Sequence, residues 1–369
     1  IALSNNATAT LNFVNAGTLT KTNAGLTYLG YTNGSSVFTN TGSLEVEAGT
    51  LRVSTSTSST VGGSVNRADG AVLELFGGSI DVPTGTDLTG TGGLHVLSGT
   101  VTLADSYTLN SMEISTGTLV STSDLTVGNL KICSGALSGS ADTTVTGSLD
   151  WTGGVMTGEG TTIIGEEATA TLNAGGVYLR GGRDFTNNGT LNQSVSSQIQ
   201  VDTAGVSSTI TNSAGAQWNA SLNANNRIAL SNNATATLNF VNAGTLTKTN
   251  AGLTYLGYTN GTFGLTNTGT FEVTEGTLQI EGTSAILNSS GTLRLTTNGS
   301  TKPLIRQGTL TIAGTLEVVL ADGYTPANGS TIRLIDYTSK TGTFGAITPP
   351  QGRTVAETYQ SDGLDVTIN

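Results

Sequence analysis

The sequence predicts an all-β fold, a parallel β-helix in which short strands wind into coils and the coils stack on one another. Three observations predict it. A motif of the form apolar-x-Asn-x-Gly-Thr-apolar recurs along the chain. Apolar residues alternate in short bursts separated by Asn, Gly, Ser and Thr, which is typical of short strands and turns. No stretch places its apolar residues at helical spacing.

The spacing of the motif fits one coil of a β-helix. Its copies include Phe13–Leu19, Phe38–Leu44, Phe185–Leu191, Leu265–Phe271 and, with one extra residue, Ile286–Leu293. The motif glycines of the first two copies lie 25 residues apart. A repeat of roughly 20 to 25 residues with two or three strands is one such coil. Because a lone coil can neither bury its inward side chains nor pair its backbone, we expect coil to stack on coil.

Stacking converts the motif into columns. We expect the last apolar residue of each copy to point inward in one column: Leu19, Leu44, Leu191, Leu246, Phe271 and Leu293. The motif asparagines should lie at the bend before the strand, where asparagine tolerates left-handed geometry, and bond to one another or to turn backbone as a structural ladder. These asparagines are Asn15, Asn40, Asn187, Asn242, Asn267 and Asn288. The simpler alternative is that Asn-x-Gly is only a turn.

A duplication is the strongest sign of repetition. Residues 1–34 return letter for letter as residues 228–261, whereas neighbouring coils are only weakly similar. We therefore expect a longer precursor that carries this block several times and is extended by it. Residues 1–307 are predicted to form the coils, and residues 308–369 the terminal coils and a C-terminal β cap that shields the open end. Ser54–Thr60 is a low-complexity stretch that reads as an exposed loop.

Composition narrows the function classes. The chain has 51 Gly in 369 residues and is 36% apolar, which suits a thin, elongated core. Its net charge of −11 argues against nucleic acid and against anionic lipid as partners. A single Cys excludes a disulfide framework, and Cys133 itself reads as a small core or strand residue. No apolar run approaches the ~18 residues of a membrane span, so we expect no membrane insertion of this segment.

A family resemblance agrees with this fold. Leu149–Gly160, followed by the Asn-x-Gly-Thr-Leu copies, resembles the passenger β-helices of bacterial autotransporter-like and haemagglutinin-like secreted surface proteins. The C-terminal region resembles the segment that often closes such passengers, in Leu316-Glu-Val, Asp322-Gly-Tyr-Thr-Pro, Ile332-Arg-Leu-Ile and Gly342-Thr-Phe. The resemblance implies a right-handed β-helix at the bacterial cell surface that serves as a stalk, adhesin or fibre subunit. It implies no catalytic residue.

The sequence thus favours an extracellular structural or adhesive role whose partners are further copies of the chain or cell-surface glycans. Exposed aromatic rings that could stack on sugars are Tyr31 and Tyr258, whereas Tyr28 and Tyr255 fit the inward alternation. Trp151 and Trp218 are further candidates of this kind.

The first alternative is a polysaccharide lyase or hydrolase, which needs clustered carboxylates and a cation or base. The candidate cluster is Glu166, Glu167, Arg180, Arg183 and Asp184, which also reads as a solvated turn beside a salt-bridged loop. His95 lies in a strand and should face outward as an exposed histidine.

Two further alternatives rest on weaker patterns. Thr-x-Thr strings at residues 7–10 and 169–171 suggest an ice-binding solenoid, although they do not recur in every coil. No cofactor is expected, but single carboxylates in stacked turns leave Ca²⁺ binding open.

Overall fold

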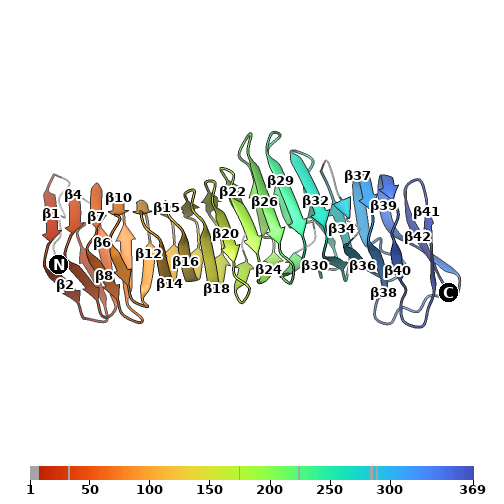
Figure 1. Ribbon diagram of the computed structural model, residues 1–369, viewed down its shortest axis with the longest axis horizontal. Helices are drawn as coiled ribbons and strands as arrows, with labels where there is room; N and C mark the ends of the chain where they lie inside the picture. Colours follow the sequence, from red (N-terminus) through yellow and green to blue (C-terminus); the bar gives the residue numbers. More distant parts are fainter. Residues whose placement is uncertain (1–7, 32–33, 174, 223–224, 283–285, 288–289) are drawn as a thin grey trace. The chain divides into compact units, whose positions relative to one another are not determined.

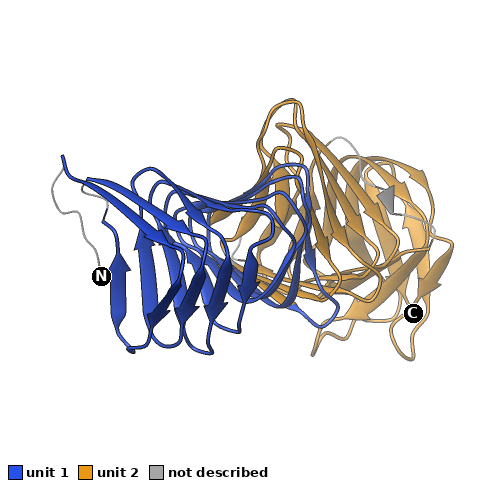
Figure 2. Ribbon diagram, turned by 60° about the vertical axis from the view of Figure 1, so that its left-hand side comes forward, with its two compact units in different colours: residues 1–168 blue, residues 169–369 orange. Residues whose placement is uncertain are grey.

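The computed structural model describes residues 8–31, 34–173, 175–222, 225–282, 286–287 and 290–369, and these form strands, turns and loops without a helix (Figure 1). Contacts divide the chain into two compact units, Ile1–Ala168 and Thr169–Asn369 (Figure 2). In each unit, strands of successive coils pair in parallel and in register, so the predicted all-β parallel β-helix is confirmed. Its right-handed winding stays a prediction. The boundary predicted after residue 307 also stays one, and a strand runs through that position.

Unit 1 is built from three parallel sheets, each of which takes one strand from a coil. The first sheet contains β1 (Thr10–Asn15), β4 (Ser35–Asn40), β7 (Ser58–Val61), β10 (Ser79–Val82), β13 (Thr100–Leu103), β15 (Thr118–Ser121), β17 (Ala136–Ser138) and β19 (Val155–Thr157). The second contains β2 (Thr18–Lys21), β5 (Ser43–Val46), β8 (Ser64–Arg67) and β11 (Asp87–Thr89). The third contains β3 (Leu26–Leu29), β6 (Thr50–Ser54), β9 (Val72–Phe76), β12 (Gly93–Val96), β14 (Tyr107–Ile114), β16 (Leu125–Ile132), β18 (Thr143–Trp151) and β20 (Thr161–Ile164).

Unit 2 repeats this plan with longer strands. One stack contains β21 (Thr169–Leu172), β24 (Thr190–Val195), β27 (Gln217–Leu222), β30 (Thr245–Lys248), β33 (Thr270–Val273), β36 (Thr292–Thr297), β38 (Thr315–Leu320) and β40 (Ala346–Thr348). A second contains β23 (Asp184–Asn187), β26 (Ser207–Asn212), β29 (Thr237–Asn242), β32 (Thr262–Asn267) and β35 (Ile286–Leu287). A third stack contains β22 (Gly176–Arg180), β25 (Gln198–Val201) and β28 (Ala229–Ser231). A fourth contains β31 (Leu253–Leu256), β34 (Thr277–Ile280), β37 (Leu304–Ile312) and β39 (Ser330–Gly342).

The duplicated segment folds alike in both units. Strands β1, β2 and β3 in unit 1 have the same bounds, residue for residue, as β29, β30 and β31 in unit 2. The first copy is the more exposed of the two, with Val14 66% exposed, while its counterpart Val241 is half-buried. Residues 8–31 and their counterparts 235–258 therefore form the same three strands at two places in the chain.

Inward side chains form the predicted apolar columns. In unit 2 the register places Leu191, Trp218, Leu246, Phe271 and Leu293 one above another, all buried. In unit 1, Leu19 pairs with Leu44 in the same way. At about 25 cal/mol per Å² of apolar surface, such columns supply most of the stability of a fold without disulfides.

The prediction of an exposed loop at Ser54–Thr60 is wrong. Ser54, Thr55 and Ser59 are buried, and β7 begins at Ser58. Small hydroxyl side chains fit inside because they bond to the backbone of the neighbouring coil: Ser59 Oγ accepts the Phe38 amide at 3.1 Å. Composition alone cannot distinguish such inward hydroxyls from loop residues.

At the C-terminal end the pairing changes direction. β42 (Gly363–Ile368) runs antiparallel to β39, and β41 (Val355–Tyr359) runs antiparallel to β42. The strands predicted around Ile332–Ile335 and Leu364–Ile368 lie within β39 and β42. The end of unit 2 is therefore an antiparallel hairpin, β41–β42, laid against the last long strand.

Candidate functional surfaces

Buried asparagine amides form a hydrogen-bonded ladder in unit 2. The Nδ2 atoms of Asn187, Asn212 and Asn242 each donate to Oδ1 of the next asparagine, at 2.8, 2.7 and 2.7 Å, and the last acceptor is Asn267. Nδ2 also donates to a backbone carbonyl, as from Asn242 to Thr270 at 2.8 Å. Each rung thus ties one coil to the next through both amide hydrogens.

The same arrangement recurs in unit 1. Asn15 donates to Oδ1 of Asn40 at 2.7 Å and to the Ser43 carbonyl at 2.8 Å. Asn40 in turn donates to the Gly62 carbonyl at 2.5 Å. Asn288, also predicted as a rung, lies outside the described residues.

The backbone geometry predicted for these rungs is wrong. Each described motif asparagine is the last residue of its strand, as Asn15 is of β1 and Asn242 of β29. Among the described non-glycine residues, positive φ occurs only at Asn225. Extended backbone is required because it keeps successive amides in register, one above another.

Asn212 is a rung that the sequence analysis missed. The inward Trp218 follows it by six positions, whereas Leu191 follows Asn187 by four. The preceding Ile210-Thr211 matches the motif, so a search that allowed a longer turn would have found it.

The motif glycine is required by close approach of two coils. A Cβ on Gly269 would lie 2.1 Å from the Gly244 carbonyl oxygen, and one on Gly42 would lie 2.1 Å from that of Gly17. At Gly17 nothing lies within 4 Å of such a Cβ. Neither Gly42 nor Gly269 has positive φ, so contact and not conformation selects glycine.

The aromatic candidates divide into exposed and buried residues. Tyr31 is 39% exposed, and Tyr258 is half-buried. The inward placement predicted for Tyr28 and Tyr255 is wrong: each has the parity of an outward position, while Leu29 and Leu256 face the core. Apolar residues of both parities occur in this four-residue strand, so alternation could not decide its register.

Trp151 and Trp218 are not surface residues. Both are 0% exposed, which rules out the predicted role in sugar stacking. The Trp218 indole donates to Gln193 Oε1 at 3.0 Å, which satisfies its N–H inside the core.

Arg227 lies against Tyr255 and Tyr258, the tyrosines of the second copy of the duplicated segment. Its guanidinium carbon lies 4.6 Å from the ring centre of Tyr255 and 4.4 Å from that of Tyr258. Nη1 donates to Glu281 Oε2 at 2.6 Å and to the Gly257 carbonyl at 2.7 Å. This cation–π and ion-pair cluster covers part of the Tyr258 ring.

The predicted acid cluster is distributed over both units. Glu166 and Glu167 are exposed residues of unit 1. In unit 2, Arg180 forms a two-pronged ion pair with Asp202, at 2.8 and 2.7 Å, and Arg183 is buried. Asp184 accepts the Thr209 amide at 2.6 Å. In unit 2 these side chains therefore have structural partners of their own.

A column of outward side chains, most of them charged and paired with the opposite charge, runs over the outer face of unit 1. Register places these residues one above another on successive coils: Tyr28, Arg52, Glu74, His95, Glu113, Lys131 and Asp150. Arg52 pairs with Glu74 at 2.7 Å, and Lys131 pairs with Glu113 at 3.6 Å. Opposite charges stacked at this spacing favour the observed register.

His95 is the centre of this column. It faces outward as predicted, but the prediction that it is exposed is wrong, because its side chain is only 25% exposed. Nδ1 lies 4.0 Å from Glu74, and the ring leans over Gly93, where a Cβ would meet Nε2 at 3.1 Å. Burial lowers the pKa of His95, while Glu113 and Glu74 act in the opposite direction.

A shallow groove of about 260 Å³ follows this column, lined among others by His95, Ser111, Glu113, Asn129, Lys131 and Asp150. Cys133 follows β16 half-buried, with Sγ 3.9 Å from Glu113 Oε1, so it lies neither in the core nor in a strand, the two places that were expected. Among the described residues no group of three or more His, Cys, Asp or Glu side chains could hold a metal ion.

The chain matches no protein family, no curated protein and no solved structure. Residues of known function therefore cannot be transferred to it by alignment. No helix in the described part of the chain is long and apolar enough to cross a membrane.

Unit 2 carries a shorter charge column. Glu272, Arg294 and Glu317 lie in register, and Arg294 Nε is 3.3 Å from Glu272 and 3.4 Å from Glu317. Both columns consist of outward side chains that neutralise one another between coils. Pairs this exposed contribute at most about 1 kcal/mol each.

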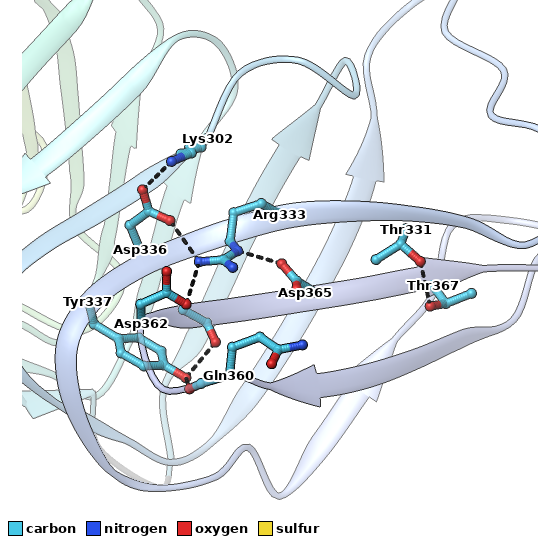
Figure 3. Close-up of polar contacts among 10 residues, drawn as sticks. Lys302, Thr331, Arg333, Asp336, Tyr337, Gln360, Asp362, Asp365 and Thr367 are labelled. Atoms are coloured by element: carbon cyan, nitrogen blue, oxygen red, sulfur yellow. Dashed lines mark hydrogen bonds and ion pairs between the residues drawn. The ribbon is translucent and has the colours of Figure 1, made fainter.

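A third polar cluster joins the C-terminal hairpin to the strands behind it (Figure 3). Arg333 on β39 bonds to Asp365 on β42, and it reaches Asp336 at 3.1 Å and Asp362 at 3.2 Å. Lys302 extends the network to Asp336. Tyr337 donates to the Gly363 carbonyl at 2.6 Å, and burial raises the pKa of its hydroxyl.

Proposed function

We propose that the protein is an extracellular structural or adhesive β-solenoid, a stalk or fibre subunit of a bacterial cell surface, without catalytic activity. One observation carries the proposal: residues 1–34 return unchanged as residues 228–261, and the described part of the first copy, residues 8–31, has the same three strands as residues 235–258. A coil whose fold does not depend on its position allows a chain to be lengthened by copying blocks. Length serves a stalk or fibre, whereas a catalytic site gains nothing from it.

The contacts between coils support this role. Asparagine rungs, motif glycines and charge columns all join one coil to the next, so each coil provides a template for its neighbour. A net charge of −11 and a single cysteine suit a soluble chain outside the cell. The antiparallel hairpin β41–β42 supports a role as terminal cap, because its strands do not continue the parallel register.

The partners in this proposal are further copies of the chain or cell-surface glycans. Among the residues that the structure describes, Tyr31 is the aromatic ring best placed for sugar contact, because 39% of its surface is exposed. Tyr258 offers less, because Arg227 covers part of it.

Electron microscopy of the native producer tests the proposal. Antibodies raised against the purified chain should label surface fibres or stalks, and a strain that lacks the gene should lose both label and fibres. Label confined to the cytoplasm, or an unchanged surface in the deletion strain, would refute it.

The second candidate is a polysaccharide lyase or hydrolase, favoured by the groove that contains His95, Glu113 and Asp150. Of its two carboxylates, Glu113 is engaged in an ion pair with Lys131. Incubation with acidic and neutral glycans, followed by assays for unsaturated and reducing ends, distinguishes the two functions. Activity that His95→Gln abolishes would establish the enzyme.

A further inference from the structure

A groove of unit 1 lies where one of its three sheets stops. β11 is the last strand of the sheet β2–β5–β8–β11, and it pairs only with β8 among the described residues. In the next coil, β14 pairs with β12 only through Ser111–Ile114. Its first half, Tyr107–Leu109, pairs with β16 alone. Two strand edges are therefore left without a ladder partner in consecutive coils.

Coil length explains the interruption. From β9 to β12 the register advances from Val72 to Gly93, which is 21 residues, but from β12 to β14 it advances from Gly93 to Ser111, which is 18. A coil that is three residues shorter has no separate strand to follow β11. The path of the second sheet is taken over by the first half of a longer β14.

Side chains bridge the gap at its two ends. Asp105 Oδ2 accepts the Gly85 amide at 2.6 Å, and Asn110 Nδ2 donates to the Thr91 carbonyl at 2.9 Å. Between these bridges no backbone hydrogen bond joins β11 to β14 in the part of the chain that the structure describes. Because the Asp87 amide donates back to Gly63, the peptide groups of Leu88 point to the open edge.

The open edge faces a groove of about 620 Å³, lined by Thr86, Asp87, Leu88, Asp105, Ser106 and Tyr107, among others. Asp87 is exposed and Asp105 half-buried. Tyr107 is 7% exposed, and its hydroxyl lies near Thr86. Burial and the charge of Asp105 raise the pKa of that hydroxyl, and Thr86 acts in the opposite direction.

We propose that this gap is a docking site for an extended, cationic peptide segment of another protein, which pairs with the open edges of β11 and β14. An unpaired parallel edge supplies main-chain donors and acceptors, the basis of strand addition. The carboxylates of Asp87 and Asp105 select lysine or arginine side chains. A second copy of this chain fits poorly, because the chain is acidic, with a net charge of −11. The site does not depend on the stalk function.

The test uses the whole chain and three fluorescent hexapeptides. The probe is Lys-Val-Thr-Val-Lys-Val-amide with an uncharged fluorophore on its N-terminus in place of a free amine. One control replaces both lysines by glutamate, and the other keeps the charge but carries N-methyl groups on alternate amides, which removes strand pairing. Anisotropy measures binding, and hydrogen exchange maps the protected segments. We expect saturable binding of the lysine peptide alone, with protection of residues 86–90 and 105–109.

Variants locate the site. Asp87→Asn should weaken binding by about threefold or more, the effect of one exposed ion pair. Asp69→Asn removes an exposed carboxylate of the same unit outside the groove and should leave binding unchanged. The proposal is overturned if the lysine peptide does not saturate, if the N-methyl peptide binds equally well, or if both variants behave alike. Protection of these segments by maltohexaose, and not by the lysine peptide, would assign the groove to glycans and also overturn it.

Discussion

Asn212 and Asn242 are thirty residues apart in the chain, yet the amide of the first donates to Oδ1 of the second at 2.7 Å inside unit 2. Asn212 also accepts from Asn187 at 2.8 Å. Replacing Asn212 by alanine should therefore leave a buried donor below and a buried acceptor above without partners. We expect a loss of about 1–3 kcal/mol in stability, measured by urea unfolding and by faster amide exchange around residues 187 and 242.

The outer amide pair of the same unit provides the matched control. Asn219 donates to Asn192 Oδ1 at 2.9 Å, but both side chains lie on the half-buried outer face. Asn219→Ala should cost less than about 0.5 kcal/mol, since water can replace the lost partner. An equal cost at both positions would contradict a special contribution from the buried ladder.

The motif glycines predict a difference between two chemically identical substitutions. Gly269→Ala places a methyl group 2.1 Å from the Gly244 carbonyl oxygen and must push two coils apart, whereas Gly17→Ala meets nothing within 4 Å. We expect a loss of about 1–3 kcal/mol for the first and no loss for the second. Thermal unfolding of both variants checks this, and a neutral Gly269→Ala would show that the coil contact can relax.

Much of this fold could be predicted from the sequence because the motif shows two periods, the two-residue alternation of a strand and the 25-residue repeat of a coil. Alternation identifies inward residues such as Leu246 and Phe271, and the 25-residue repeat places one above the other. Each coil obeys the same local rule, so a contact between distant residues follows from a local pattern.

Contacts between outward side chains are harder to predict, because they depend on the lengths of coils whose sequences match the motif poorly. Glu113 and Lys131 lie in register because they are 18 positions apart and the coil at this point has 18 residues. Nothing in the sequence indicates that coil length, so the pair could not be predicted. Tyr28 shows a second limit: a four-residue strand with apolar residues of both parities has two plausible registers, and burial of Leu29 decides between them. The gap beside β11 could not be predicted either, because it arises from a change in coil length that the sequence does not indicate.

The inward column predicts opposite outcomes at adjacent residues. Leu246 is 0% exposed between Trp218 and Phe271, so Leu246→Asp buries a charge without a partner and should unfold the surrounding coils. Thr247 faces outward beside Glu272, and Thr247→Asp should cost only about 1 kcal/mol or less through repulsion between the carboxylates. Circular dichroism melts of the two variants provide the comparison, and equal tolerance would contradict the column.

Arg333 should determine how firmly the C-terminal hairpin is held. Its guanidinium serves Asp365, Asp336 and Asp362, and Arg333→Gln would leave three carboxylates close together without their shared cation. We expect faster hydrogen exchange in β41 and β42 and unchanged exchange in unit 1. Thr331→Val, which removes only the hydroxyl contact to Thr367 at 3.1 Å, serves as the mild control. Uniform exchange across the chain in Arg333→Gln would mean that the hairpin has no separate opening.

Lys248 predicts a pH dependence of stability in the alkaline range. Its ammonium is buried against the backbone carbonyls of Asn250, Gly252 and Glu275, the last at 2.6 Å. Burial lowers the pKa of Lys248 from 10.5 to about 8. Between these values the unfolded chain binds the extra proton, so the Lys248 contribution to stability should rise with pH from about 8 to 10.5 and stay constant below 8.

The measurement is the difference in unfolding free energy between the native chain and Lys248→Met at each pH. Taking this difference removes the contributions of all groups that titrate alike in both proteins. The difference should move in favour of the native chain by up to about 3 kcal/mol across the window. If the three carbonyls stabilise the ammonium more than burial penalises it, the Lys248 difference will be flat up to pH 10.5, and the lowered pKa will have been disproved.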